Sequence, residues 1–360
     1  MRTFSHPGYK RFLLSVGCLL SIHFTALFFL TLFRLVFFFS ANYDFPDQEH
    51  VGFMSIWPAF IRGVWFDNVI ACYILLIPLV AVSISALFNY YGKILWNVTC
   101  IFFSLFYGIV LLVTAANIPY FQYFFKIINS SVFNWFGYMN TTAGMVFGET
   151  SYYPPLIGFL LTLVLFIWLM RRLIRHFQRL LNTKNPSVFW LDRIYIFLTA
   201  CICIGLCLFG IRGRTGYNPI KVSAAYYCTD PFLNQLGISP VFNLLSSTLD
   251  DSRKENRYLH LMPENEALEN TRHYLNRPGI EGISPIARQI NASDSLRRPN
   301  IVLIFMESMS AHLMKRFGQQ KELTPFLDSL YRQSLAFSNF YSSGIHTNHG
   351  MYATLYSFPS

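Results

Sequence analysis

The hydrophobic pattern of the chain is dominated by five long apolar stretches in its first 211 residues. They cover Phe12–Phe39, Val69–Phe88, Ile94–Ala116, Pro155–Met170 with its flanks, and Ile194–Ile211. A span needs about 20 mostly apolar residues to cross the hydrocarbon core of a bilayer. The first stretch is too long and too aromatic for a cleaved signal peptide and lacks a small-residue cleavage site, so we interpret it as an anchor. The pattern predicts five membrane-spanning helices, with the two termini on opposite sides.

Basic residues around the apolar stretches predict the orientation in the membrane. They lie before the first stretch, between the second and third, and between the fourth and fifth: Arg2, Lys10, Arg11, Lys93, Arg171, Arg172, Arg175, Arg179, Lys184 and Arg193. The first alternate loop is acidic, with Asp67 as its last acid, and the second, residues 120–153, is neutral and aromatic. By the positive-inside rule the N-terminus is cytoplasmic and everything after residue 211 is extracytoplasmic. Arg212, Arg214 and Lys221 run against this scheme, but late charges rarely reverse an orientation set by earlier helices.

Composition supports a membrane protein and excludes several soluble classes. Hydrophobic residues make up 53% of the chain and charged residues 13%, with a mean hydropathy of +0.38. These values exclude a soluble globule, a disordered protein and a disulfide-rich secreted module. The net charge of +10 is assigned to cytoplasmic loops, so it gives no reason to expect a nucleic-acid partner. Six of the seven cysteines lie within apolar stretches, and only Cys228 lies outside, without the spacing of a disulfide framework or metal site.

Two ionisable residues interrupt the first apolar stretch, and such groups in lipid are functional candidates by default. Arg34 lies near the outward end, so we expect its long side chain to reach the interface, with a lipid-headgroup site as the alternative. His23 is expected to form a neutral hydrogen bond between helices rather than a proton relay. The aromatic loop over residues 120–153 is expected to be an interfacial belt, or alternatively an amphipathic surface helix that receives lipid substrate.

The composition changes after the last apolar stretch. Charged residues of both signs become dense over residues 250–298, which predicts a water-facing linker with a helix that begins after Pro263. We therefore expect three parts. A five-span membrane domain covers residues 1–211, an extracytoplasmic connector covers 212–298, and the start of an α/β domain covers 299–360.

The last part carries the pattern of an α/β sheet. Asn300–Met306 is continuously apolar and β-branched, which is typical of a strand buried on both faces. It ends at Glu307, and a carboxylate at the carboxyl end of a parallel strand lies where open α/β sheets bind ligands, with oxygens that suit a divalent cation. Taken alone, Glu307 fits a helix cap or an ion-pair partner equally well. Residues 323–330 predict a short amphipathic helix with Thr324 at its N-cap, and residues 335–341 predict a second strand.

Thr347 lies in the loop after the second predicted strand, four residues before the apolar run Met351–Leu355, and we place it at a loop-to-helix junction. A hydroxyl at such a loop-to-helix junction lies against free backbone N–H groups and the positive end of the helix dipole. Phosphate binds well there, and an alkoxide is stabilised. The segment alone fits either a nucleophile or an ordinary N-cap, and N-caps are the more frequent.

The combination of these motifs, placed behind five spans, resembles a known family. A strand ending in Glu-Ser is followed by Thr-Pro-x-Leu-Asp-x-Leu, Phe-Ser-Asn-Phe-Tyr and Gly-x-x-Thr, all between Pro299 and Ser360. This order is similar to the lipoteichoic acid synthase branch of the alkaline phosphatase and sulfatase superfamily. Glu307-Ser308 fits that branch better than the related phosphoethanolamine transferases, whose comparable strand usually ends in Gly-Glu-Thr/Ser. The resemblance implies an extracytoplasmic α/β domain of the alkaline phosphatase/sulfatase type, in a bacterial cytoplasmic membrane protein.

The resemblance also implies an activity and site residues. Members of the family take phosphoglycerol from phosphatidylglycerol or a similar phospholipid and pass it to a glycan or lipid acceptor, with a divalent ion, usually Mn²⁺. The match places the threonine nucleophile at Thr347, which also contacts the metal, and the first metal ligand at Glu307. His346 stands where the family often has Lys or Arg, and His349 lies where acids are common, so the transferred headgroup stays open. Both histidines are candidates for binding phosphate or tuning the metal, and loop histidines with no such role are the alternative.

The family's remaining metal ligands and its substrate-binding histidines lie far beyond the nucleophile. We therefore expect these 360 residues to be the amino-terminal part of a longer enzyme and to be inactive alone. A metal-dependent phosphate or sulfate ester hydrolase of the same fold is the main alternative, although Gly344–Gly350 has no Cys or Ser for formylglycine formation. A non-catalytic membrane scaffold or a transporter is less favoured, because spans two to five contain little charge.

Overall fold

The computed structural model describes residues 6–41, 53–148, 150–181, 190–253, 261–274, 300–344 and 347–357. The chain divides into two compact units, Met1–Leu261 and Met262–Ser360. All regular secondary structure within the described ranges is helical. The predicted division into parts at residues 211 and 298 stays a prediction.

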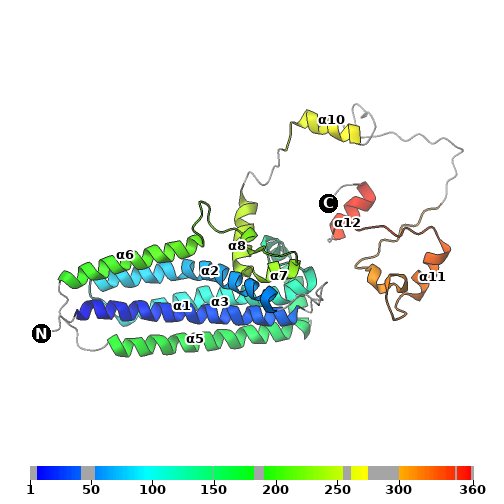
Figure 1. Cartoon of the computed structure of the whole chain (residues 1–360). Helices are drawn as coiled ribbons and strands as arrows, with labels where there is room; N and C mark the ends of the chain where they lie inside the picture. Colours follow the sequence, from blue (N-terminus) through cyan, green and yellow to red (C-terminus); the bar gives the residue numbers. More distant parts are fainter. Residues whose placement is uncertain are drawn as a thin grey trace. The chain divides into compact units, whose positions relative to one another are not determined.

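Within its described residues, the first unit is a bundle of five long helices that run side by side (Figure 1). They are α1 (Pro7–Ser40), α2 (Phe53–Leu87), α3 (Lys93–Phe124), α5 (Tyr153–Leu181) and α6 (Trp190–Arg212). Each is long and apolar enough to cross a membrane, so the five predicted spans are helices, which is compatible with a multi-pass membrane protein. α2 packs mainly against α1 and α6, whereas α5 packs against α3 and α1.

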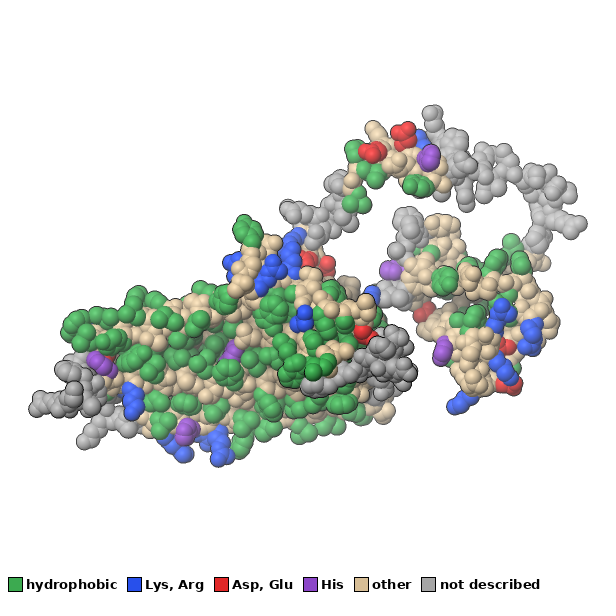
Figure 2. All heavy atoms as spheres, in the orientation of Figure 1, with side chains coloured by type: hydrophobic (Ala, Val, Ile, Leu, Met, Phe, Trp, Pro, Cys, Tyr) green, Lys and Arg blue, Asp and Glu red, His purple; other side chains and the backbone are tan. Residues whose placement is uncertain are grey.

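The outer surface of the bundle carries many exposed apolar side chains. Phe24 is 64% exposed, and Leu161 and Leu206 are each 66% exposed. Hydrophobic side chains cover much of the face of the bundle seen in Figure 2. An apolar surface of this extent is unfavourable in water, whereas lipid tails solvate it well. The bundle therefore has the surface that a bilayer-embedded unit needs.

The orientation of the bundle stays a prediction, and two introduced cysteines would test it. Tyr217 is 95% exposed just beyond the end of α6, and Arg179 is exposed near the end of α5. In intact spheroplasts we expect a membrane-impermeant maleimide to label Tyr217→Cys, and to label Arg179→Cys only after permeabilisation. The parent chain, in which Cys228 is half-buried, gives the background. The reverse labelling pattern would contradict the extracytoplasmic placement of the C-terminal unit.

Residues 213–253 form a small cap that packs against the end of the bundle where α6 ends (Figure 1). The cap contains η3 (Val222–Ala225), α7 (Pro231–Leu236) and α8 (Pro240–Ser252). Tyr227 joins it to α2: the phenol donates to the Ser55 carbonyl at 2.6 Å, and the Arg62 guanidinium lies 4.6 Å from the ring centroid. Burial raises the pKa of Tyr227 to about 12. The phenol therefore stays protonated and keeps donating at neutral pH.

The aromatic loop between α3 and α5 folds into short helices beside the cap. They are η1 (Ser130–Tyr138), α4 (Met139–Gly148) and η2 (Thr150–Tyr152). Phe136 and Tyr138 are 61% and 72% exposed. The backbone amide of Ser130 donates to the Ser247 hydroxyl of α8 at 2.9 Å, which fastens η1 to the cap. Exposed rings on short surface helices fit both sequence interpretations, the aromatic belt and the amphipathic surface helix.

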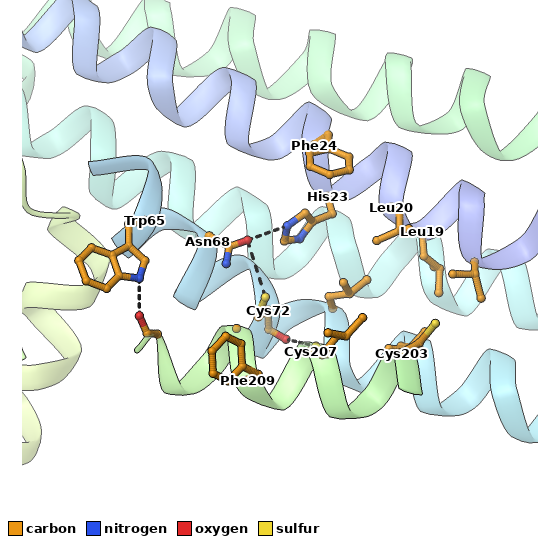
Figure 3. A pocket seen from close by; sticks show the side chains of 16 residues that line it. Leu19, Leu20, His23, Phe24, Trp65, Asn68, Cys72, Cys203, Cys207 and Phe209 are labelled. Carbon is orange, nitrogen blue, oxygen red and sulfur yellow. Dashed lines mark hydrogen bonds between the residues drawn. The ribbon is translucent and has the colours of Figure 1, made fainter. Parts of the chain in front are cut away.

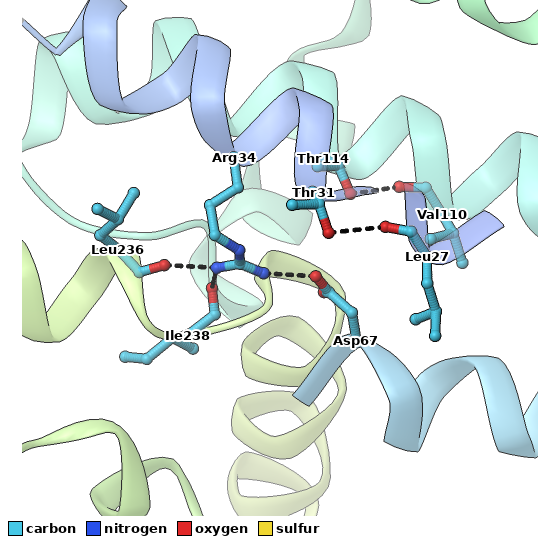
Figure 4. Close-up of polar contacts among 8 residues, drawn as sticks. All are labelled: Leu27, Thr31, Arg34, Asp67, Val110, Thr114, Leu236 and Ile238. Atoms are coloured by element: carbon cyan, nitrogen blue, oxygen red, sulfur yellow. Dashed lines mark hydrogen bonds and ion pairs between the residues drawn. The ribbon is translucent and has the colours of Figure 1, made fainter. Parts of the chain in front are cut away.

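The prediction that Arg34 reaches the interface is wrong. Arg34 is only 5% exposed and forms an ion pair with Asp67 of α2, with Nη2 and Oδ2 2.5 Å apart (Figure 4). Its Nη1 donates to the carbonyl of Leu236 at the end of α7 and to that of Ile238 at 3.1 Å. Because α2 begins at Phe53, Asp67 lies inside a helix that packs on α1 rather than in a loop. The guanidinium therefore has partners inside the protein and does not need the interface.

Gly63, one turn before Asp67 on α2, provides the space that this ion pair needs. A Cβ at position 63 would overlap the Arg34 guanidinium, so only glycine allows the close approach. A buried charge is tolerated when it is both paired and hydrogen-bonded, and here the carboxylate and two carbonyls share the guanidinium. α1, α2 and the cap are thus joined at a single cation.

The second unit contains short helices and, in its described residues, no strand. The helices are α10 (Glu264–Tyr274), η4 (Ala311–Leu313), η5 (Lys315–Phe317), α11 (Pro325–Gln333) and α12 (Thr347–Tyr356). α10 begins directly after Pro263, as predicted, and α11 has Thr324 at its N-cap position with Pro325 as its first residue. The short helices expected from the sequence are therefore present.

The two predicted strands are not formed. Residues 300–306 are irregular, and their apolar side chains are exposed, from 46% at Phe305 to 85% at Ile301. Residues 335–341 are also irregular, with Phe340 83% exposed. A strand is held by hydrogen bonds to a neighbouring strand and by burial of its faces, and the described part of the chain supplies neither to these segments. The α/β architecture stays an expectation that is not visible in this structure.

Candidate functional site

Glu307 lies where the apolar segment over residues 300–306 turns. Ser308, the next residue, has φ of +55°, in the left-handed region that residues other than glycine rarely occupy. The Glu307 carboxylate is exposed at this turn. Three other described residues that are not glycine have the same conformation, so the turn changes the direction of the chain after Glu307 and does not by itself indicate a function.

Thr347 is the first residue of α12, and its hydroxyl donates a hydrogen bond to Glu307 Oε1 at 2.7 Å. Both side chains are exposed. The first turn of a helix has free backbone N–H groups and the positive end of the helix dipole, both of which favour an anion or a developing alkoxide. The structure thus brings together the two residues that the family resemblance assigned to nucleophile and metal ligand, across 40 positions of sequence.

The two histidine candidates differ in what the structure describes. His349 is half-buried in the first turn of α12, and Gly350 beside it packs on the apolar segment: a Cβ there would lie 3.2 Å from Phe305 Cζ. His346 lies outside the described residues. The roles of both in binding phosphate or tuning a metal stay predictions.

Asp328 is a buried acid of the same unit that the sequence analysis did not single out as a site residue. It is 9% exposed, and its Oδ2 accepts hydrogen bonds from Thr324 Oγ1 at 3.1 Å and from the Lys315 amide at 3.3 Å. The spacing of Thr324 and Asp328, i and i+4 at a helix start, is the signal that could have indicated this contact. These bonds hold the start of α11 against η5, which is a structural role.

Comparison with known proteins bears on the segment that holds Glu307 and Thr347. Residues 299–360 match the model of the Sulfatase family. The match supports the alkaline phosphatase/sulfatase superfamily for this Sulfatase segment, and it suggests an enzyme that acts on phosphate or sulfate esters. No curated protein and no solved structure matches the chain significantly. The lipoteichoic acid synthase branch stays a proposal.

The pair of oxygens in the Sulfatase segment fits a divalent cation. Adjacent ligands of an octahedral site with metal–oxygen distances of about 2.1 Å lie about 3 Å apart, close to the 2.7 Å between Thr347 Oγ1 and Glu307 Oε1. Carboxylate and hydroxyl oxygens suit Mg²⁺ or Mn²⁺. No group of three or more His, Cys, Asp or Glu residues that could hold a metal occurs within the described residues. The two oxygens are therefore candidate ligands that lie close together, and metal binding by Glu307 and Thr347 stays a prediction.

Proposed function

We propose that the protein is a membrane-bound, metal-dependent phosphotransferase. It would move phosphoglycerol, or a similar phosphoalcohol, from a phospholipid to an extracytoplasmic glycan or lipid acceptor. The observation that carries the proposal is the hydrogen bond between Thr347 and Glu307 inside the segment that matches the Sulfatase family. The five apolar helices support a lipid donor, because they would hold the enzyme in the same bilayer as that donor. The proposed location is the bacterial cytoplasmic membrane, with the second unit outside.

Thr347 is the nucleophile of the proposed reaction. Its oxygen forms a bond to phosphorus while the bond from phosphorus to the diacylglycerol oxygen breaks, and that oxygen takes up a proton as diacylglycerol leaves. Phosphoglycerol is then esterified to Thr347. The acceptor hydroxyl attacks this phosphorus and loses its proton, the bond from phosphorus to Thr347 Oγ1 breaks, and Oγ1 takes up a proton. When bound, a divalent cation, Mn²⁺ in this proposal, would lower the pKa of the Thr347 hydroxyl and neutralise negative charge on the phosphoryl oxygens. Glu307 would hold the cation and orient Thr347, and the α12 N-terminus would favour the developing negative charge.

Hydrolysis of a phosphate or sulfate ester is the second candidate, and the description of the matched family favours it. The first displacement on Thr347 is then the same, and water rather than an alcohol discharges the enzyme ester. The two candidates differ only in the second displacement.

Trapping the covalent intermediate tests the proposal and separates the two candidates. The full-length enzyme is mixed with Mn²⁺ and phosphatidylglycerol carrying radiolabelled phosphorus, quenched in acid and digested. We expect the label on the peptide that contains Thr347, and faster loss of label when a glycan or lipid acceptor is added. If the label leaves the enzyme at the same rate with and without the acceptor, water discharges the intermediate and the protein is a hydrolase. Turnover with no label on Thr347 contradicts the proposed mechanism.

A further inference from the structure

A groove opens on the surface of the bundle between α1, α2 and α6, with a volume of about 400 Å³ (Figure 3). Its wall is mainly apolar and includes Leu20 of α1, Leu75 of α2, and Leu206 and Phe209 of α6. Leu206 and Phe209 are 66% and 52% exposed, so the groove faces outward from the bundle. Because these helices are apolar enough to span a membrane, the medium outside the groove is lipid.

The groove is about one half to two thirds as long as the hydrocarbon core of a bilayer is thick. Its lining on α6 runs from Cys203 to Gly213, about 15 Å of helix at 1.5 Å per residue, and its lining on α2 runs from Trp65 to Leu79, about 21 Å. The hydrocarbon core is about 30 Å thick. Gly213 directly follows the end of α6, beside the cap, so the groove begins at that level and extends past the middle of α2, to Leu79. These dimensions fit one acyl chain that enters from the leaflet on the side of the cap.

The wall also presents a hydrogen-bond donor near its outer end. His23 Nε2 and Asn68 Oδ1 are 3.0 Å apart, which is the hydrogen bond between α1 and α2 expected for His23 (Figure 3). The Asn68 Nδ2 group donates to no residue in the described part of the chain. It lies 3.6 Å from where a Cβ on Gly210 would be, so it is level with Gly210, about 5 Å inward of Gly213. A lipid with its phosphate beside Gly213 would have its ester carbonyls at about this level, just below the headgroup.

Cationic side chains flank the outer end of the groove. Gly213 lies between Arg212 and Arg214, and the indole of Trp65 donates to the Gly213 carbonyl, which holds this turn in place. Arg212 donates to the Tyr217 carbonyl at 2.7 Å. Neither arginine is paired with a carboxylate of the described residues. These two arginines also run against the positive-inside rule. An anionic partner on that side of the membrane would account for their position.

We propose that the groove binds an anionic phospholipid of the leaflet on the side of the cap. One acyl chain lies along α6, Asn68 Nδ2 donates to an ester carbonyl, and the phosphate lies against Arg212 and Arg214. Charge complementarity selects an anionic headgroup over a zwitterionic one. That this lipid is the donor of the transferred headgroup rests on the proposed function, whereas its binding does not.

Photo-crosslinking in nanodiscs tests the groove in the complete chain. The probes are phosphatidylglycerol and phosphatidylcholine with a diazirine on the same acyl carbon, and crosslinked peptides are identified by mass spectrometry. We expect crosslinks to concentrate on α1, α2 and α6, with higher yield for phosphatidylglycerol. Arg214→Gln is expected to lower the ratio of phosphatidylglycerol to phosphatidylcholine crosslinking about fivefold.

A matched pair of substitutions controls for general effects on the bundle. Leu206 lines the groove and Leu161 of α5 does not, and both are 66% exposed. Leu206→Trp is expected to reduce groove crosslinking severalfold, and Leu161→Trp is expected to leave it unchanged. Equal effects of the two changes, or crosslinks spread evenly over all five helices, would overturn the proposal. Thr347→Ala should leave the crosslinks unchanged, so failure of the proposed chemistry and failure of the groove give different results.

Discussion

Thr347→Ala is expected to lower kcat of the full-length enzyme by about 10³-fold or more. Alanine leaves no atom at position 347 that can form a bond to phosphorus, so the covalent route is closed. Membrane insertion should be unchanged, because Thr347 is exposed and its side chain bonds only to Glu307 among the described residues. The measurement is phosphatidylglycerol turnover with Mn²⁺, together with the covalent label on the enzyme.

Thr324→Ala is the matched control for this prediction. Thr324 is also a threonine at the start of a short helix in the same unit, and its hydroxyl also donates to a carboxylate, Asp328, at 3.1 Å. Its loss is expected to cost about 1 kcal/mol of stability and to leave the covalent label in place. Retained turnover in Thr347→Ala would remove Thr347 from its role. Equal loss of activity in both variants would instead indicate damage to the fold.

The five long helices could be predicted because a helix that crosses a bilayer needs a long continuous run of apolar residues, which is easy to recognise in a sequence. An apolar run of about 20 residues has few alternatives to a spanning helix, and all five such runs are long helices in the structure. The boundaries were less accurate: α2 begins at Phe53, whereas the apolar window began at Val69. Polar residues at the outer end of a helix lower the mean hydropathy of a window without ending the helix. The window therefore left Asp67 in a loop.

The partners of Arg34 could not be read from the sequence for the same reason. Once Asp67 is placed in a loop, no acid is available inside the membrane, and the interface is the remaining destination for the guanidinium. The other partners are the carbonyls of Leu236 and Ile238, more than 200 positions away, and backbone carbonyls carry no sequence signal. Only the packing of the cap on the bundle reveals this contact.

The candidate site was located by motif order rather than by predicted secondary structure. The resemblance singled out Glu307 and Thr347, and their side chains are in contact. The strands that should carry them are not formed, because a strand depends on neighbours that the described residues do not provide. Local features such as the Thr324-Pro325 helix start need only a few residues, and these were predicted correctly. Helix starts, which depend on a few neighbouring residues, were therefore predicted more reliably than strands, which depend on distant ones.

Breaking the Arg34–Asp67 pair is expected to destabilise the membrane unit by about 3–5 kcal/mol. Both side chains are almost completely buried, at 4% and 2% exposure, so removing one leaves a charge without its counter-ion. Asp67→Asn keeps the shape but removes the negative charge, and Arg34→Met keeps the length but removes the cation. The measurement is the free energy of unfolding of the complete chain in detergent micelles. Arg62→Met is the control. Arg62 is a half-buried arginine of α2 that donates to the Ala224 carbonyl at 3.2 Å, and its loss is expected to cost only about 1 kcal/mol.

The double substitution Arg34→Met with Asp67→Leu separates loss of charge pairing from loss of packing. If the cost of each single change is an unpaired buried charge, removing both charges should recover much of the stability, so the double variant is more stable than either single one. Full recovery is not expected, because the carbonyls of Leu236 and Ile238 lose their donor. Additive losses would contradict this interpretation, since they would show that each side chain stabilises the bundle independently. A double variant that unfolds in two steps would instead locate the role of Arg34 in holding the cap, because α7 would then separate from a bundle that is still folded.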